Sequence, residues 1–81
     1  MNYTQECPIG VVLYFEQPDD TEDVNCDLEY YNTKVEALTA ARNAVERAQS
    51  HPMNKGNYYC EVFDLLNRFK DIRIEPKTRQ K

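Results

Sequence analysis

Several residue types and patterns are scarce or missing in this chain. Its 81 residues contain no tryptophan, two glycines and one histidine, His51. Its longest hydrophobic run, Ile9–Phe15, has the length of a strand, far short of the roughly 20 residues that a membrane-spanning helix needs. The first six residues lack the basic start and the long apolar stretch of a signal peptide. We therefore expect no membrane span and a location in the host cell cytosol.

Motifs that carry catalysis are also missing. The chain has no glycine-rich phosphate loop, no HExxH pattern and no GxSxG pattern. Cys60 and His51 could form a thiol–imidazole pair, but the sequence offers no third group to orient it. The adjacent Asp19 and Asp20 belong to a loop that we expect to be solvated, where burial cannot tune carboxylates for acid–base chemistry. The calcium-loop spacing is absent as well. We therefore expect no enzyme and no cofactor.

The three cysteines, Cys7, Cys26 and Cys60, do not have the spacing of a disulfide framework or a zinc motif. Together with His51 they could supply a Cys3His zinc site, but structural zinc sites use closely spaced ligand pairs. A bridge between Cys26 and Cys60 requires their strands to be adjacent. Free thiols, buried or half-buried, are favoured over both, and we expect no metal.

Charge is distributed unevenly along the chain. Residues 1–36 hold nine acids and one base, a net charge of −8, whereas residues 37–81 hold five acids and nine bases, a net charge of +4. Clustered charge of one sign selects the surfaces that can approach a protein. Seven acids and no base occupy residues 16–29: Glu16, Asp19, Asp20, Glu22, Asp23, Asp27 and Glu29.

Two segments before the middle of the chain alternate as strands do. The first is Gly10–Gln17, ended by Pro18 and the acidic loop. Its two faces carry Val11, Leu13 and Phe15 on one side and Val12, Tyr14 and Glu16 on the other. The second is Asn25–Tyr31, which we expect to turn Cys26, Leu28 and Tyr30 to a dry face and Asp27, Glu29 and Tyr31 to a wet one.

A helix follows the second strand. Thr33 and Glu36 have the spacing of a capping box, alanines favour helix, and Ser50-His51-Pro52 ends it. We expect the His51 side chain to hydrogen-bond the terminal carbonyls. The predicted sheet-facing stripe is Val35, Leu38, Ala41, Val45 and Ala48, with Leu38 as its main anchor against Leu13, Leu28 and Val62.

The last third is ambiguous, because residues 59–69 fit helical spacing while residues 58–63 are rich in strand-forming types. We favour a third strand over Tyr58–Leu65, a turn at residues 66–68, and a fourth strand over Phe69–Glu75 with Ile72 and Ile74 inward. The basic segment 76–81 is predicted to be a mobile tail. The sequence thus predicts a single α+β domain over residues 1–81, with an ordered core over residues 9–75. Its plan is ββαββ, with a four-stranded, mainly antiparallel sheet and one helix on one face.

The order of these segments supports a resemblance. A strand ending in Tyr-Asn-Thr leads into the helix Thr-Lys-Val-Glu-Ala-Leu-Thr-Ala-Ala-Arg, and Glu-Val-Phe-Asp-Leu-Leu-Asn-Arg-Phe follows. This plan resembles small accessory proteins of phages and mobile elements, and some anti-CRISPR proteins are similar in size, acidity and strand–helix–strand order. The resemblance spans residues 10–75 as a pattern and carries over no functional residue. It implies a compact, non-catalytic protein that binds and blocks a host nucleic-acid machine.

The uncovered sheet face and the acidic loop suggest how such binding would occur. Tyrosine and phenylalanine are enriched at protein interfaces, and a carboxylate-rich loop can enter a basic channel. The alternative is that the acidic loop of this chain is solvated and only aids solubility. We hypothesise an inhibitor or adaptor that binds the basic surface of a host defence effector such as a CRISPR–Cas complex. The expected contact residues are Tyr14, Glu16, Asp19, Asp20, Glu22, Asp23, Asp27, Glu29, Tyr31, Tyr59 and Phe63.

Two alternatives remain open. In the first, the uncovered face pairs with its own copy across a two-fold axis through Tyr14, Tyr59 and Phe63, giving a homodimer with a structural or regulatory role. In the second, the basic C-terminal third binds nucleic acid, which requires its charge to outweigh the acidic half; we expect no specific binding of this kind. Its candidate residues are Arg68, Lys70, Arg73, Lys77, Arg79 and Lys81.

Overall fold

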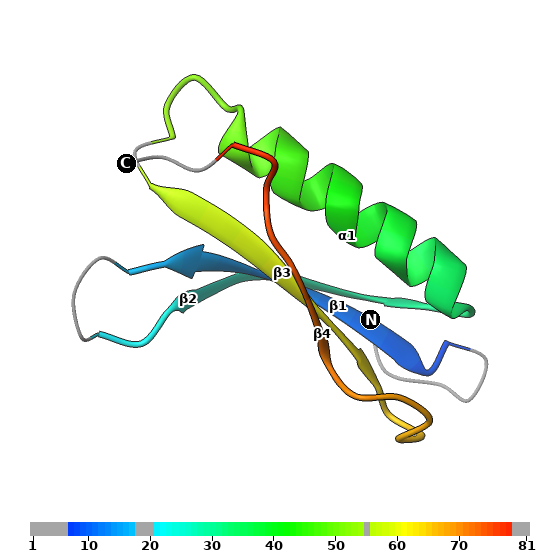
Figure 1. Ribbon diagram of the computed structural model, residues 1–81. Coiled ribbons are helices and arrows are strands. Elements are labelled where there is room, and N and C mark those ends of the chain that lie inside the picture. The colour runs from blue at the N-terminus through cyan, green and yellow to red at the C-terminus, as the bar shows by residue number, and fades with distance from the viewer. Residues whose placement is uncertain (1–6, 18–20, 55, 79–81) are drawn as a thin grey trace.

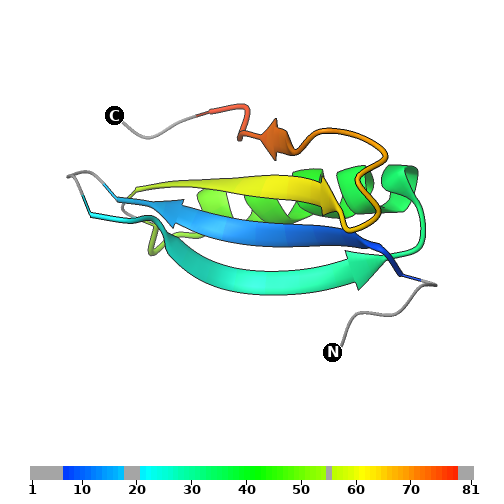
Figure 2. The ribbon, with the colours of Figure 1, turned by 90° about the horizontal axis from the view of Figure 1, so that it is seen from below.

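The computed structural model describes residues 7–17, 21–54 and 56–78. Its elements are β1 (Ile9–Glu16), β2 (Val24–Tyr31), α1 (Lys34–Gln49), β3 (Asn57–Asp64) and β4 (Ile72–Ile74). The strands form one antiparallel sheet in the order β2-β1-β3-β4, and α1 packs on one face of it (Figure 1 and Figure 2). The predicted α+β fold with a ββαββ plan is confirmed.

The core lies between α1 and the two central strands. Alternate residues of β1 and β3 point toward the helix, because β1 pairs with β3 in register along its whole length. Small helix residues meet them, so the helix lies close to the sheet. The buried cluster consists of Ile9, Val11, Cys60 and Val62 from the sheet and Ala37, Ala41 and Val45 from α1.

The helix begins as the sequence predicts. The Thr33 Oγ1 accepts a hydrogen bond from the Glu36 amide at 3.1 Å, and the Thr33 hydroxyl donates to the Glu36 carboxylate at 3.0 Å. At the other end the Ser50 amide and hydroxyl both bond the Glu46 carbonyl. The predicted role of the His51 side chain is wrong: its Nδ1 accepts from the Met53 amide at 3.1 Å. The terminal carbonyls are already bonded by other groups: that of Glu46 by Ser50, that of Ala48 by the His51 amide and that of Gln49 by the Asn54 side chain. The imidazole therefore bonds the following turn.

The buried line of α1 is rotated from the predicted stripe. The structure buries Ala37, Ala41, Val45 and Gln49, which follow one another at the four-residue spacing of a single helix face. Val35 is 73% exposed, and Leu38 is only half-buried at the edge of the core. Leu38 is therefore not the main anchor; Val45 is the largest fully buried side chain of the helix.

Gln49 ends the buried line with a polar side chain that is fully used. Its Nε2 donates to the Gly56 carbonyl at 3.3 Å and to the Asn57 Oδ1 at 3.1 Å. Its Oε1 accepts from the Tyr58 amide at 2.9 Å. These bonds fix the start of β3 beneath the end of α1.

The ambiguous segment forms a strand, but the fourth strand is shorter than predicted. It spans Ile72–Ile74 instead of Phe69–Glu75, because the chain after β3 makes a turn held by Asp64 and by Asn67 at a φ of +56°. The Asp64 carboxylate accepts from the Leu66 and Arg68 amides, each at 3.0 Å, and pairs with the Arg68 Nε at 2.7 Å. Ile72 and Ile74 pack against the core as expected.

The predicted mobile tail begins too early, because Pro76 and Lys77 are bound to the rest of the protein. Pro76 is buried, and the Lys77 amide donates to a Glu46 carboxylate oxygen of α1 at 2.8 Å. Residues 79–81 of that tail lie outside the described residues.

Candidate functional site

The side chains that could meet a partner lie on the face of the sheet opposite α1. Figure 2 shows the ribbon from this side, with α1 behind the strands. Directly paired residues of antiparallel strands share a face, so Val12 of β1, Leu28 of β2 and Glu61 of β3 lie together on it. We call this surface the open face. Its other members are Gly10, Tyr14, Tyr30, Tyr59, Phe63 and Arg73.

One aromatic cluster lies at the end of the open face where β1 begins. The Phe63 ring lies directly on Gly10, so that a Cβ at position 10 would overlap the ring. Tyr30 meets Phe63 edge-on, with 6.4 Å between the ring centroids. Glycine is therefore required at position 10 for close approach, and the ring covers backbone that glycine leaves bare.

A second cluster lies at the other end. Tyr14 stacks on Tyr59 with 5.2 Å between centroids, and the Arg73 guanidinium lies 3.8 Å from the Tyr59 ring centre. Tyr59 is consequently only 6% exposed. Tyr14 and Arg73 thus cover most of the Tyr59 ring in the free protein, and direct contact of Tyr59 with a partner stays a prediction.

The buried Tyr59 fixes Asp23, which directly precedes β2, to the sheet. Its hydroxyl donates to the Asp23 Oδ2 at 2.5 Å, and the Gln17 amide donates to the other carboxylate oxygen at 3.0 Å. The Tyr59 hydrogen bond, followed by the Gln17 amide, lowers the pKa of Asp23. Burial, and then the Asp23 partner, raise the pKa of Tyr59. Asp23 is thus a structural carboxylate, while the neighbouring Glu22 is exposed.

The remaining predicted acids occupy different places. Glu16 pairs with Arg73 at 3.1 Å beside the second cluster. Asp19 and Asp20 lie outside the described residues. Asp27 and Glu29 pair with Leu13 and Val11, which places both acids on the helix side of β2.

The predicted faces of β2 are therefore reversed. Tyr31, Asp27 and Glu29 are on the helix side, and Leu28 and Tyr30 are on the open face, where Leu28 is 44% exposed. The physical reason is that α1 covers mainly the central strands β1 and β3, so the helix side of the edge strand β2 remains wet. Acids can lie there without losing their hydration. The expectation that the apolar residues of an alternating strand face the helix therefore does not hold for β2.

Tyr31 closes the small space between β2 and α1. Its ring packs against the core, and its hydroxyl donates to the Glu29 Oε2 at 2.7 Å. Burial, and then the hydrogen bond to Glu29, raise the pKa of Tyr31 to about 12. The recess beside it, of about 30 Å³, is also lined by Asp27, Ala40 and Ala44. It is too small for a ligand larger than water.

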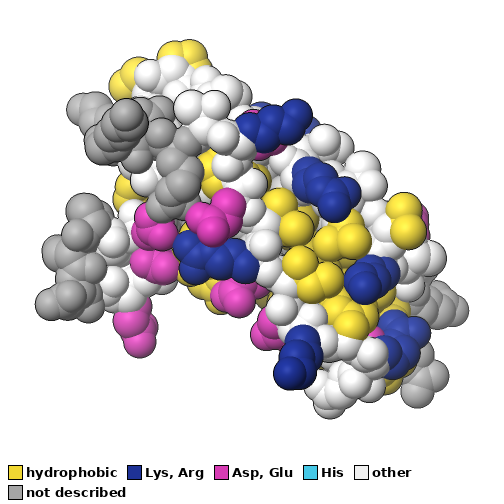
Figure 3. Space-filling model, viewed as in Figure 1, with side chains coloured by type: hydrophobic (Ala, Val, Ile, Leu, Met, Phe, Trp, Pro, Cys, Tyr) yellow, Lys and Arg dark blue, Asp and Glu magenta, His cyan; other side chains and the backbone are white. Residues whose placement is uncertain are grey.

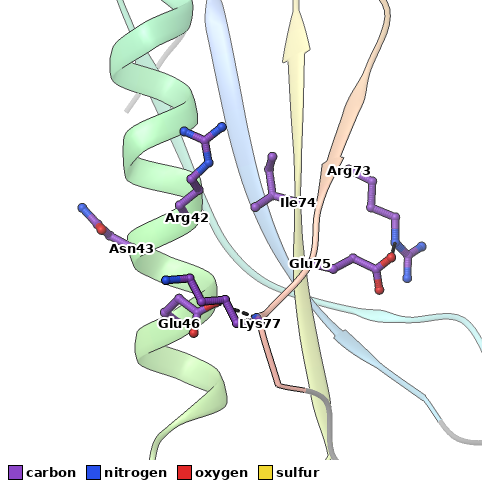
Figure 4. Close-up of a pocket in the computed structure, with 7 residues that line it drawn as sticks. All are labelled: Arg42, Asn43, Glu46, Arg73, Ile74, Glu75 and Lys77. Atoms are coloured by element: carbon purple, nitrogen blue, oxygen red, sulfur yellow. Dashed lines mark hydrogen bonds and ion pairs between the residues drawn. The ribbon is translucent and has the colours of Figure 1, made fainter.

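Two larger hollows lie on the side of α1 away from β2, between the helix and the C-terminal third of the chain. One of about 500 Å³ is lined by Arg42 and Glu46 of α1 and by Ile74, which points toward the helix (Figure 4). A second of about 350 Å³ is lined by Lys34, Arg68 and Phe69. Figure 3 shows hydrophobic side chains exposed on this side with lysines and arginines around them. Neither lining includes a cysteine or histidine that could act as a nucleophile or base.

Within residues 7–17, 21–54 and 56–78, no group of three histidine, cysteine or acidic side chains could hold a metal ion. Over the same ranges, no helix has the length and apolar character needed to cross a membrane. The three cysteines are free thiols, with Cys26 exposed and Cys60 buried on the helix side.

Comparison with known proteins returned no relative. The chain matches no family model, no curated protein and no solved structure.

Sequence reasoning missed Leu28, Tyr30 and Arg73 as members of the open face. The alternation in β2 was visible, but its direction depends on pairing with β1, which opposes Val12 to Leu28. Gly10 was the sequence signal for the aromatic cluster of Phe63 and Tyr30, because a glycine in a strand interior marks a place where another group approaches closely.

Proposed function

We propose that this chain is a small non-catalytic binding protein, an inhibitor or adaptor that recognises a basic protein surface. The resemblance of its plan to that of some anti-CRISPR proteins suggests, as the partner, a nucleic-acid-binding effector of a host defence system. One observation carries the proposal: β2 and the three residues before it contain four acids and no lysine or arginine. These acids are Glu22, Asp23, Asp27 and Glu29.

The position of these acids strengthens the proposal. Glu22, Asp27 and Glu29 are exposed, and Val24 and Leu28 are each 44% exposed between them. A protein interface combines such apolar anchors with complementary charge, which raises the rate and the selectivity of encounter. We call this surface, Glu22–Glu29, the acidic edge. Phosphate would be repelled by it, which favours a protein over a nucleic acid.

The test is a pull-down of host proteins at low and at moderate salt, read by mass spectrometry. Glu22→Lys combined with Asp27→Lys reverses two exposed charges and avoids Asp23, whose removal would also release Tyr59. We expect this variant to bind a captured partner about tenfold more weakly at low salt, equivalent to about 1.4 kcal/mol.

The matched control is Asp71→Lys, because Asp71 is also exposed but lies before β4, on the other side of the sheet. The control should retain binding, although it too makes the net charge less negative, by half as much as the double variant does. Equal binding by the double variant and the wild type would contradict the proposal.

A further inference from the structure

We infer that the groove between α1 and β4 binds a short, extended, acidic segment of another protein, with an apolar side chain between two carboxylates. This inference does not rest on the proposed function, because it uses the basic side of the molecule instead of the acidic edge. We call the surface the basic groove. Its six residues are Lys34, Leu38 and Arg42 of α1, Phe69, and Ile72 and Ile74 of β4.

The floor of the basic groove is apolar because α1 does not cover β4. The helix packs on β1 and β3, and β4 is the last strand of the sheet. Ile72 and Ile74 pair with core residues of β3, so they face the helix, but they are only partly buried. Leu38 and Phe69 are partly buried against the same core. Figure 3 shows hydrophobic side chains at the surface on this side. A partner that covers this floor therefore removes apolar surface from water.

Two cations lie along the helix side of the floor. Lys34, Leu38 and Arg42 follow one another at four-residue spacing, which places them on one line of α1. The Lys34 Nζ lies 4.7 Å from the Phe69 ring centre, and Arg42 lines the same hollow as Ile74 (Figure 4). Among the described residues, neither cation has an acid within ion-pair distance. Both charges are therefore available to a carboxylate from outside.

The nearby carboxylates are directed to other groups. Glu46 accepts a backbone amide of the C-terminal segment at 2.8 Å. Glu75 lies 3.7 Å from the Arg73 Nε. Asp71 is exposed before β4, with Lys70 directly before it. The helix side of the groove thus has a positive charge at each end of Leu38.

The distance between the two cations specifies the segment that fits. Lys34 and Arg42 are eight residues apart on the helix, about 12 Å at about 1.5 Å per residue. In an extended chain every second side chain lies on the same face, and four residues span about 13 Å. An acid, an apolar residue and a second acid at alternate positions therefore reach Lys34, Leu38 and Arg42 together.

A polypeptide fits the basic groove better than a nucleic acid does. Single strands bind through their phosphates and through bases that stack on aromatic rings. Phe69 is the aromatic residue of the groove, and Lys34 lies over its ring. The rest of the floor is aliphatic, which suits the apolar side chain of a peptide.

The acids of the chain itself do not have the required pattern. Acids four residues apart enclose Pro18, Thr21, Asn25 or Arg73 at the midpoint. None of these residues offers a large aliphatic or aromatic side chain to Leu38. A second copy therefore does not supply the segment. The four acid pairs are Glu16 and Asp20, Asp19 and Asp23, Asp23 and Asp27, and Asp71 and Glu75.

The probe is the end-capped peptide Ser-Glu-Ser-Leu-Ser-Glu-Ser, which is too short to form a helix in water. NMR shifts of the methyl groups of Leu38, Ile72 and Ile74 measure its binding. One control peptide, Ser-Glu-Glu-Leu-Ser-Ser-Ser, keeps the composition and loses the spacing. The other replaces the leucine by serine and keeps both acids. We expect the probe to shift all three methyl groups and to bind about fivefold more tightly than either control.

Arg42→Glu and Arg47→Glu form a matched pair of variants, because each replaces an exposed arginine of α1 by glutamate. Arg47 lies about 140° around the helix from Arg42, away from the groove. We expect Arg42→Glu to weaken binding of the probe about fivefold, since it replaces attraction by repulsion. Arg47→Glu should change binding by less than about twofold, because solvent and salt screen its charge from the groove.

Each outcome supports or overturns the inference. Equal binding of the three peptides, or equal losses in the two variants, shows attraction by net charge alone and overturns it. Failure of the probe to shift the methyl groups at millimolar concentration also overturns it. Shifts that follow protein concentration without peptide assign the groove to a second copy. Shifts caused by a single-stranded oligonucleotide but not by the probe assign the groove to nucleic acid. Both results contradict the inference.

The proposed function is tested separately. Its charge reversals at Glu22 and Asp27 lie at or beside β2, whereas the groove variants lie on α1. Loss of a captured partner in the first set with unchanged peptide binding, or the converse, shows which of the two proposals fails.

Discussion

Asp64 is a charged side chain with no exposed surface, and the turn after β3 is organised around it. Its carboxylate accepts two backbone amides and two nitrogens of Arg68. The Arg68 hydrogen bond is the largest of the effects that lower the pKa of Asp64 to about 2. A buried charge is tolerated only when it is bonded in this way, and these bonds hold the turn in its observed form.

This low pKa predicts an acid-sensitive component of stability. Because the folded-state pKa lies below the unfolded value of about 3.9, the stabilisation is complete above about pH 4 and is lost as the pH falls through about 2. We expect Asp64→Asn to lower the urea midpoint at pH 7. We also expect the variant to show a smaller further loss than the wild type between about pH 4 and about pH 2. Parallel pH dependences of the two midpoints would show that Asp64 is not the titrating group.

At the scale of the elements, α1 is held to the sheet by Val45 more than by Leu38. Val45 is fully buried within the core cluster, whereas Leu38 is partly buried and packs against that cluster. Val45→Ala removes fewer atoms than Leu38→Ala but opens a closed space. We expect losses of about 2 kcal/mol and about 1 kcal/mol respectively, from buried area and cavity formation. Urea melts of both variants measure this order, and the reverse order would place the centre of the core near the helix N-terminus.

The sequence predicts the elements better than their orientation. The β1 alternation and the capping residues Thr33 and Glu36 are local signals, and both are confirmed. The faces of β2 and the buried line of α1 depend on how far the helix reaches across the sheet, which no local pattern encodes. The shortened β4 depends on the Asp64 turn, whose bonds join residues that the strand pattern treats independently. The candidate site shares this limit, because pairing with β1 decides which residues form the open face.

At the scale of the whole molecule, the packing of the helix on the sheet can be tested with the three cysteine thiols, because they are buried to different extents. Cys60 lies between the sheet and the helix, and burial followed by the Asp27 charge raises its pKa to about 11. Cys26 is exposed on β2, and Cys7 is half-buried with its thiol donating to Asn32. Only the thiolate is the reactive form. We expect a thiol reagent at mildly alkaline pH to label Cys26 first and Cys60 only in urea, as read by mass spectrometry. Cys60 labelling at the rate of Cys26 in native buffer would contradict the layer arrangement.

The strand order also gives the protein an electric dipole. Asp27 and Glu29 lie on β2 at one side of the sheet with no base on that strand, whereas Lys70, Arg73 and Lys77 outnumber Asp71 and Glu75 around β4 at the other. The net charge of −4 therefore understates the field close to the molecule. In the field of a charged body this protein rotates before it touches: a cationic surface meets β2 first, and a polyanion meets β4 first. Orientation of this kind raises the fraction of collisions that succeed and leaves the strength of the final contacts unchanged.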